Sequence, residues 1–155
     1  MKDTCFTISN IAAGSQKQIS AIIDAKIIPA LVLLFNTSNE IEIKAEVTWA
    51  LANALSNGNE THITYLIDQD CISCLCKFIE FYDIITIEAV LEALENVYKV
   101  GESLVKEKVK RNNIFLQHLQ ETSESQLLKL YHEVDDDSIK LKISSIYSLL
   151  GKNIE

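Results

Sequence analysis

One five-residue segment returns at a fixed interval along this chain. The segment Phe6–Asn10 recurs as Trp49–Asn53 and again as Glu92–Asn96. The asparagines that end the three copies are 43 residues apart each time. A chain with a regular period of this length is expected to build the same structural unit several times.

A period in the forties is typical of a helical solenoid of the armadillo or HEAT type. The units of such a fold stack on their neighbours and form an extended concave surface, which favours a binding module over an enzyme. The composition agrees, because 48% hydrophobic residues can supply a core and only one proline and four glycines interrupt the chain. At 155 residues, the chain has the length of one ordinary domain.

The repeat divides the chain into units of three helices each. The third and longest helix of a full unit is predicted over about 40–56 and again over about 84–100. Four units follow from this spacing. They are a partial unit at 4–14 that holds only a third helix, full units at 15–58 and 59–101, and a degenerate unit at 102–150 before a tail at 151–155.

Helix ends are predicted from capping residues. Gly14, Gly58 and Gly101 follow third helices closely and are expected to adopt the positive φ of a C-terminal cap. Ser15 and Asn59 are expected N-caps of first helices, Asn39 and Asp83 of third helices, and Ser138 of the last helix. The degenerate unit is expected to contain a first helix over 102–119, a second over 125–134 and a third over 138–150.

The charge and the cysteines limit the possible functions. A net charge of −8 argues against binding to duplex nucleic acid and suits a basic partner. We find no secretory signal and no membrane-spanning run, so reduced thiols are expected. The cluster Cys71, Cys74 and Cys76 lacks the second pair that a zinc site needs and falls in an apolar second helix. These cysteines are therefore predicted to be core residues, with no metal and no cofactor.

The repeated segment places polar and aromatic side chains on one helical face. Trp49 and Asn53 are one turn apart, and Glu46 precedes Trp49 by three residues. An asparagine can clamp a peptide backbone, while a tryptophan face and a carboxylate can hold a lysine. Alternatively, Trp49 is a core residue and Asn53 bonds a neighbouring helix. The presence of Glu92 at the third aromatic position favours a groove over a core.

The blocks that carry the repeat resemble the C-terminal armadillo repeats of importin-α (karyopherin-α). They are CFTISNIAAG at 5–14, EVTWALAN at 46–53 and LEALENVYKVGE at 91–102. The resemblance implies an all-α, right-handed α-α superhelix of armadillo repeats, spanning about repeats 7 to 10 of that family. It also implies a non-enzymatic adaptor that binds basic nuclear localisation signals and shuttles between cytoplasm and nucleus.

Residue roles follow from the same resemblance. Asn10 and Asn53 would bind the cargo backbone, Trp49 lysine stems and Glu46 a lysine charge. Phe6 stands where the family has tryptophan, so this subsite is expected to be weaker. The full set of expected peptide-binding residues is Phe6, Asn10, Glu46, Trp49, Asn53, Glu92 and Asn96.

An alternative function places the partner at the C-terminal end. In this hypothesis the chain is a truncated armadillo scaffold that has lost cargo binding and keeps only a surface for an export receptor or a nucleoporin. Glu133 and the run Asp135–Asp137 could belong to that surface, or they could form a solvated turn between helices. The basic run at 106–111 is interpreted as a solvated segment, with a nuclear signal of the chain's own as the other possibility.

Overall fold

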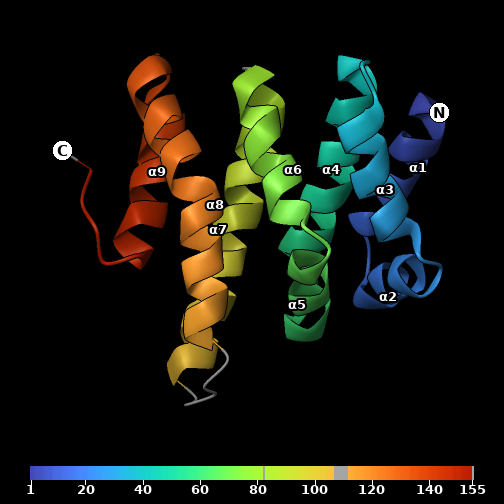
Figure 1. Cartoon of the computed structure of the whole chain (residues 1–155), viewed down its shortest axis with the longest axis horizontal. Helices are drawn as coiled ribbons and strands as arrows, with labels where there is room; N and C mark the ends of the chain where they lie inside the picture. Colours follow the sequence, from blue (N-terminus) through green and yellow to red (C-terminus); the bar gives the residue numbers. More distant parts are fainter. Residues whose placement is uncertain (82, 107–111, 155) are drawn as a thin grey trace.

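In the computed structural model, the helices of this chain form a row. The structure describes residues 1–81, 83–106 and 112–154, but not the side chains of 104–106, 112–116, 118 and 119. Its two termini lie at opposite ends of the row (Figure 1). The helices are α1 (Lys2–Ala12), α2 (Gln16–Asp24), α3 (Ile27–Thr37), α4 (Ile41–Asn57), α5 (Glu60–Asp68), α6 (Cys71–Phe78), the 3-10 turn η1 (Ile79–Phe81), α7 (Ile84–Lys106), α8 (Asn112–Glu133) and α9 (Asp137–Leu149). Every regular element in the described residues is helical, so the all-α prediction is confirmed.

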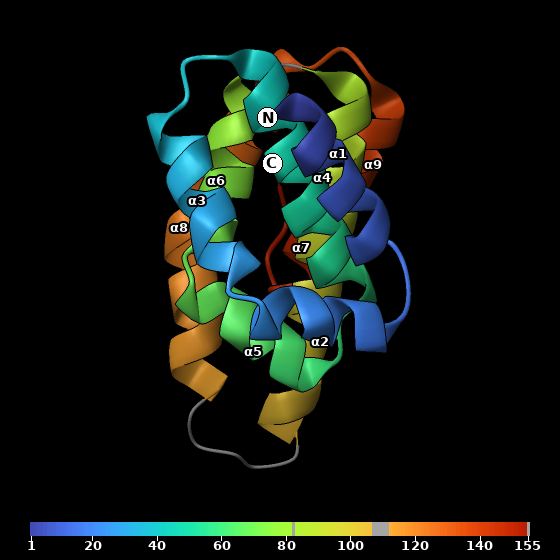
Figure 2. The ribbon, with the colours of Figure 1, turned by 90° about the vertical axis from the view of Figure 1, so that its right-hand side faces the viewer.

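Helices that hold the same place in successive units pack side by side. The third helices α1, α4, α7 and α9 form one layer, with each in contact with the next. The helices α3, α6 and α8 form the opposite layer (Figure 2). The short helices α2 and α5 lie across one end of both layers. Because each unit contacts only its neighbours, the fold extends along one direction.

The central helix α4 is apolar on more than one side because it packs between two third helices. Its buried side chains include Val47, Leu51 and Leu55, none of which exposes measurable area. A helix that is apolar around most of its circumference is stable only when it is covered on several sides. In α4 this cover comes from α1 and α7 on its flanks and from α3 and α6 across the layer.

The predicted N-caps of both first helices are confirmed, whereas Glu40 rather than Asn39 is the N-cap residue of α4. Ser15 caps α2, with its backbone N–H donating to Gln18 Oε1 at 2.8 Å. Asn59 caps α5, and its Oδ1 accepts a hydrogen bond from the backbone N–H of His62 at 3.0 Å. The first helix of each full unit therefore begins with a reciprocal capping box.

The positive φ predicted at Gly14, Gly58 and Gly101 is wrong, because Gly151 is the only glycine with positive φ among the described residues. Gly58 ends α4 in an extended conformation with a φ of −71°, and Gly101 lies buried inside α7, which continues to Lys106. Positive φ is instead found at Lys26 (58°) and Asp70 (63°), which occupy equivalent turns before α3 and α6. Both full units thus have a residue other than glycine in the left-handed conformation at this turn.

The last unit also differs from the prediction. A single helix, α8, replaces the separate helices predicted over 102–119 and 125–134, because no glycine or proline separates those segments. Within α8, the Oγ atom of the buried Ser123 lies 2.9 Å from Tyr98 Oη of α7. This hydrogen bond fixes the middle of α8 against α7. Asp136, rather than Ser138, caps α9. Residues 107–111 of the basic run lie outside the described residues.

Among the described helices, none is both long and apolar enough to cross a membrane by itself. The pair α2 and α3 meets the length and composition test only when taken together, and these helices are bent by 73° relative to each other.

The packing of α4 predicts a large asymmetry between two leucine substitutions. Leu51→Ala should lower the free energy of unfolding by about 2–5 kcal/mol, because it opens a cavity between α1 and α7. Leu141→Ala on α9 is the matched control, since that leucine is 71% exposed and its loss should change little. Urea unfolding followed by circular dichroism measures both values, and equal losses would contradict the packing described here.

Candidate functional site

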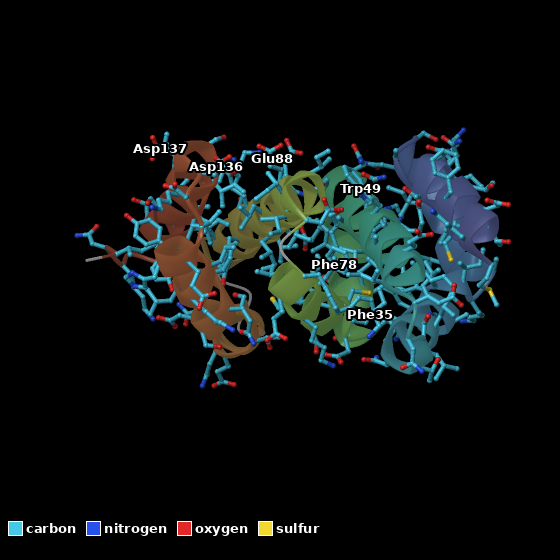
Figure 3. All side chains as sticks on the ribbon, turned by 90° about the horizontal axis from the view of Figure 1, so that it is seen from above. Phe35, Trp49, Phe78, Glu88, Asp136 and Asp137 are labelled. Carbon is cyan, nitrogen blue, oxygen red and sulfur yellow. The ribbon has the colours of Figure 1, made fainter. Side chains whose placement is uncertain are left out.

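A groove of about 570 Å³ runs between the third helices α4 and α7. Trp49, Asn53, Ser56 and Asn57 of α4 line one wall. The other wall is made by α7 residues from Ile85 to Lys99, and Lys142 of α9 also reaches the groove. Figure 3 shows Trp49 and Glu88 on the same side of the molecule, away from Phe35 and Phe78 of the opposite layer. Four expected site residues, Trp49, Asn53, Glu92 and Asn96, therefore lie together.

Two hydrogen bonds in series link the Trp49 ring to Thr86 and Asp83 on the other side of the groove. Its indole Nε1–H donates to Thr86 Oγ1 at 3.0 Å, and the Thr86 hydroxyl donates in turn to the Asp83 carboxylate. Trp49 is only half-buried, so the ring packs against the core while part of its surface faces the groove. The indole N–H is thus satisfied internally, which leaves the ring for apolar or cation–π contact.

Two asparagines of the repeat bridge adjacent third helices. Asn53 Nδ2 donates to the Ser9 backbone oxygen at 3.1 Å and lies 3.2 Å from Ser9 Oγ. Asn96 Nδ2 donates to the Leu55 backbone oxygen at 2.8 Å. The alternative in which Asn53 bonds a neighbouring helix therefore describes the structure correctly. In the described residues, no group donates to Oδ1 of either asparagine, so one acceptor remains on each.

Carboxylates dominate the α7 wall. Glu88 and Glu92 line the groove, and neither makes an ion pair with a described residue. Glu95 lies further along and is bound to Lys99, with 2.7 Å between Oε1 and Nζ. The two unpaired carboxylates create a negative potential beside Trp49, as a lysine subsite requires.

Three expected site residues lie outside this groove. Phe6, which is 55% exposed, and Asn10 are both on α1, and the side chain of Asn10 forms no hydrogen bond with another described residue. Glu46 does not line the groove, and its negative charge acts on a residue of α1. Burial chiefly raises the pKa of the Cys5 thiol, and Glu46 contributes to the same rise. Whether these three residues form a second subsite along α1 and α4 stays a prediction.

Eight residues that line the groove were not predicted from the sequence, and Glu88, Ser56 and Lys142 are three of them. Glu88 could have been found, because it precedes Glu92 by four residues and so shares its helical face. Ser56 also follows Asn53 by three residues. The presence of Lys142 at the groove could not be predicted from helical spacing, because it depends on how α9 packs against α7.

The cysteine cluster is part of the core. All four cysteines are buried free thiols, and the described residues hold no group of three or more histidine, cysteine or acidic side chains arranged for a metal. Burial raises the pKa of Cys74 to about 11 and that of Cys76 to about 12. Burial also raises the pKa of the Cys71 thiol far above its usual range.

The acidic turn before α9 has a structural role at one of its residues. Asp136 Oδ1 accepts a hydrogen bond from the Ile139 backbone N–H at 3.0 Å, which caps the helix. Asp135 and Asp137 are exposed. A partner surface here stays a prediction.

Comparison with known proteins agrees with this architecture. The armadillo/β-catenin-like repeat family matches residues 15–56. Importin subunit alpha-5 of Arabidopsis thaliana is 36% identical over 65% of this chain, and importin subunit alpha-1a of Oryza sativa subsp. japonica is 39% identical over 94% of it. The chain therefore has an armadillo-repeat fold and is similar in sequence to importin subunits alpha.

The match to importin-α covers only part of those relatives. This chain spans 19% of the Arabidopsis protein and 27% of the rice protein. Among solved structures, a designed armadillo repeat protein in complex with the peptide (KR)4 superposes with a TM-score of 0.73. That likeness covers 96% of this chain and 56% of the designed chain at 24% identity, so it supports the armadillo fold alone.

The asparagine bridges predict unequal effects at the three repeated positions. Asn53→Ala and Asn96→Ala should each lower the free energy of unfolding by about 0.5–1.5 kcal/mol, because each removes a hydrogen bond between third helices. Asn10→Ala should leave stability almost unchanged. Thermal unfolding of the three variants tests this order, and a loss for Asn10→Ala as large as for the others would refute it.

The burial of the thiols predicts low chemical reactivity. Thiolates are the reactive species, so a raised pKa and burial both slow attack on a disulfide reagent. All four cysteines should react slowly in the native protein and rapidly after unfolding in guanidinium chloride. Fast reaction of Cys71, Cys74 or Cys76 in native protein, followed by mass spectrometry, would show that the cluster is accessible.

Proposed function

We propose that the groove between α4 and α7 binds a lysine-rich, extended peptide, and that the chain serves as a non-catalytic nuclear-import adaptor segment for basic localisation signals. The observation that carries this proposal is the meeting of Trp49 with the unpaired carboxylates Glu88 and Glu92 in one groove. A lysine needs an apolar surface for its stem and negative charge for its ammonium, and this groove offers both.

The asparagines give the proposed groove a way to hold a peptide backbone. Asn53 and Asn96 are fixed by their Nδ2 bonds to the preceding third helix, so their orientation is set before a ligand arrives. Their Oδ1 atoms are left to accept backbone N–H groups of an extended chain. Contacts of this kind hold a peptide without reading its side chains, so lysine selection falls to Trp49 and the carboxylates.

Similar proteins support the same type of ligand. The relatives named above are importin subunits alpha, and the designed armadillo neighbour carries a peptide of alternating lysine and arginine. The net charge of −8 also attracts a basic peptide at long range. In this proposal the adaptor moves between cytoplasm and nucleus with its cargo.

Charge removal on α7 provides the direct test. The double variant Glu88→Gln/Glu92→Gln should weaken binding of a lysine-rich peptide by about threefold to tenfold, because the half-buried Glu88 and the exposed Glu92 no longer attract its ammonium groups. Trp49 is the only tryptophan in the chain, so its fluorescence reports on the groove directly. Affinity should also fall as salt is raised.

The matched control removes the same charge elsewhere. Glu60→Gln/Glu80→Gln changes two exposed carboxylates on α5 and η1, neither of which lines the groove. This control should bind the peptide almost as the unmodified protein does. Equal weakening in both double variants would mean that net charge, and not this groove, accounts for the affinity.

A further inference from the structure

One side of the proposed peptide groove is lined by a cationic side chain, that of Lys142. Lys142 is its only lining residue from α9, and its side chain is half-buried. The remaining cation at the groove, Lys99, is already bound to Glu95. Lys142 forms no ion pair with a described residue, so its ammonium is open to a ligand.

The charge of the side chains that line the groove therefore changes from negative on α7 to positive on α9. On α7, Glu88 and Glu92 present unpaired carboxylates, whereas α9 presents Lys142. A ligand that crosses from α4 over α7 towards α9 passes from Trp49 through negative charge to a positive one. The aspartates that begin α9 do not line the groove, and Lys142 lies about 7 Å further along the helix axis from Asp137.

We infer that Lys142 is a specificity-determining residue that selects peptides carrying an acidic residue on the flank that leaves the groove over α9. This inference rests on the proposed peptide-binding function and adds a direction to it. A lysine at this position repels a basic flank and attracts a carboxylate. The opposite wall belongs to α4, which packs against α1, and Glu46 places negative charge near Cys5 on that side. An acidic residue on that flank meets like charge and is disfavoured.

Three peptides with one lysine-rich core provide the probe. One carries two glutamates before the core, one carries them after it, and one carries glutamines on both sides. For the unmodified protein, one glutamate position should raise affinity by about twofold to fivefold over the glutamine peptide, and the other should lower it. Trp49 fluorescence gives all three dissociation constants.

Variants of α9 then assign the effect to one side chain. Lys142→Gln should abolish the gain from the favoured glutamates, and Lys142→Arg should keep it. Lys140→Gln is the matched control, because it removes the same charge from the same helix at a position that does not line the groove. That control should retain the preference.

Several results would overturn the inference. Glutamates that lower affinity equally on both flanks would remove the directional claim while leaving peptide binding intact. A preference that persists in Lys142→Gln, or one lost equally in Lys140→Gln, would exclude Lys142 as its source. Failure of all three peptides to bind would instead refute the peptide groove itself, and the inference with it.

Discussion

The structure depends on the burial of one third helix between two others. Helix α4 is apolar around most of its surface, and only α1 and α7 beside it, with α3 and α6 across the layer, keep that surface from water. This packing also sets the distance between the repeated faces. Because α4 and α7 lie side by side, Trp49 and Glu92 come to line one groove although they are far apart in the sequence. The functional surface is thus a consequence of how the core is covered.

The asparagine repeat has a structural role in the contact between third helices. Asn53 and Asn96 tie each third helix to the one before it through Nδ2, while their Oδ1 atoms stay available. The two interpretations of the motif, a bond to a neighbouring helix or a clamp for a ligand, therefore use different atoms of one side chain. The bond to the neighbouring helix fixes the amide plane, and a fixed amide costs less conformational entropy when it binds.

Much of the fold could be predicted from the 43-residue period, and the site only in part. The period identified the third helices and put Trp49, Asn53 and Asn96 on a common face. It failed at Gly101, where α7 continues through the glycine, and in α8, where no glycine or proline ends the helix. It also missed Lys142, because a residue of α9 reaches the groove only through packing between units. Periodicity determines faces within a helix, whereas neighbours across units depend on the whole stack.

The most direct measurement of the central claim is a nuclear magnetic resonance titration with a lysine-rich peptide. The account predicts that the indole N–H of Trp49 and the side-chain amides of Asn53 and Asn96 shift together and saturate at one dissociation constant. Groups on the α3, α6 and α8 layer should remain unchanged. Shifts confined to that opposite layer, with Trp49 and the two asparagines unaffected, would contradict the claim that the third helices form the binding surface.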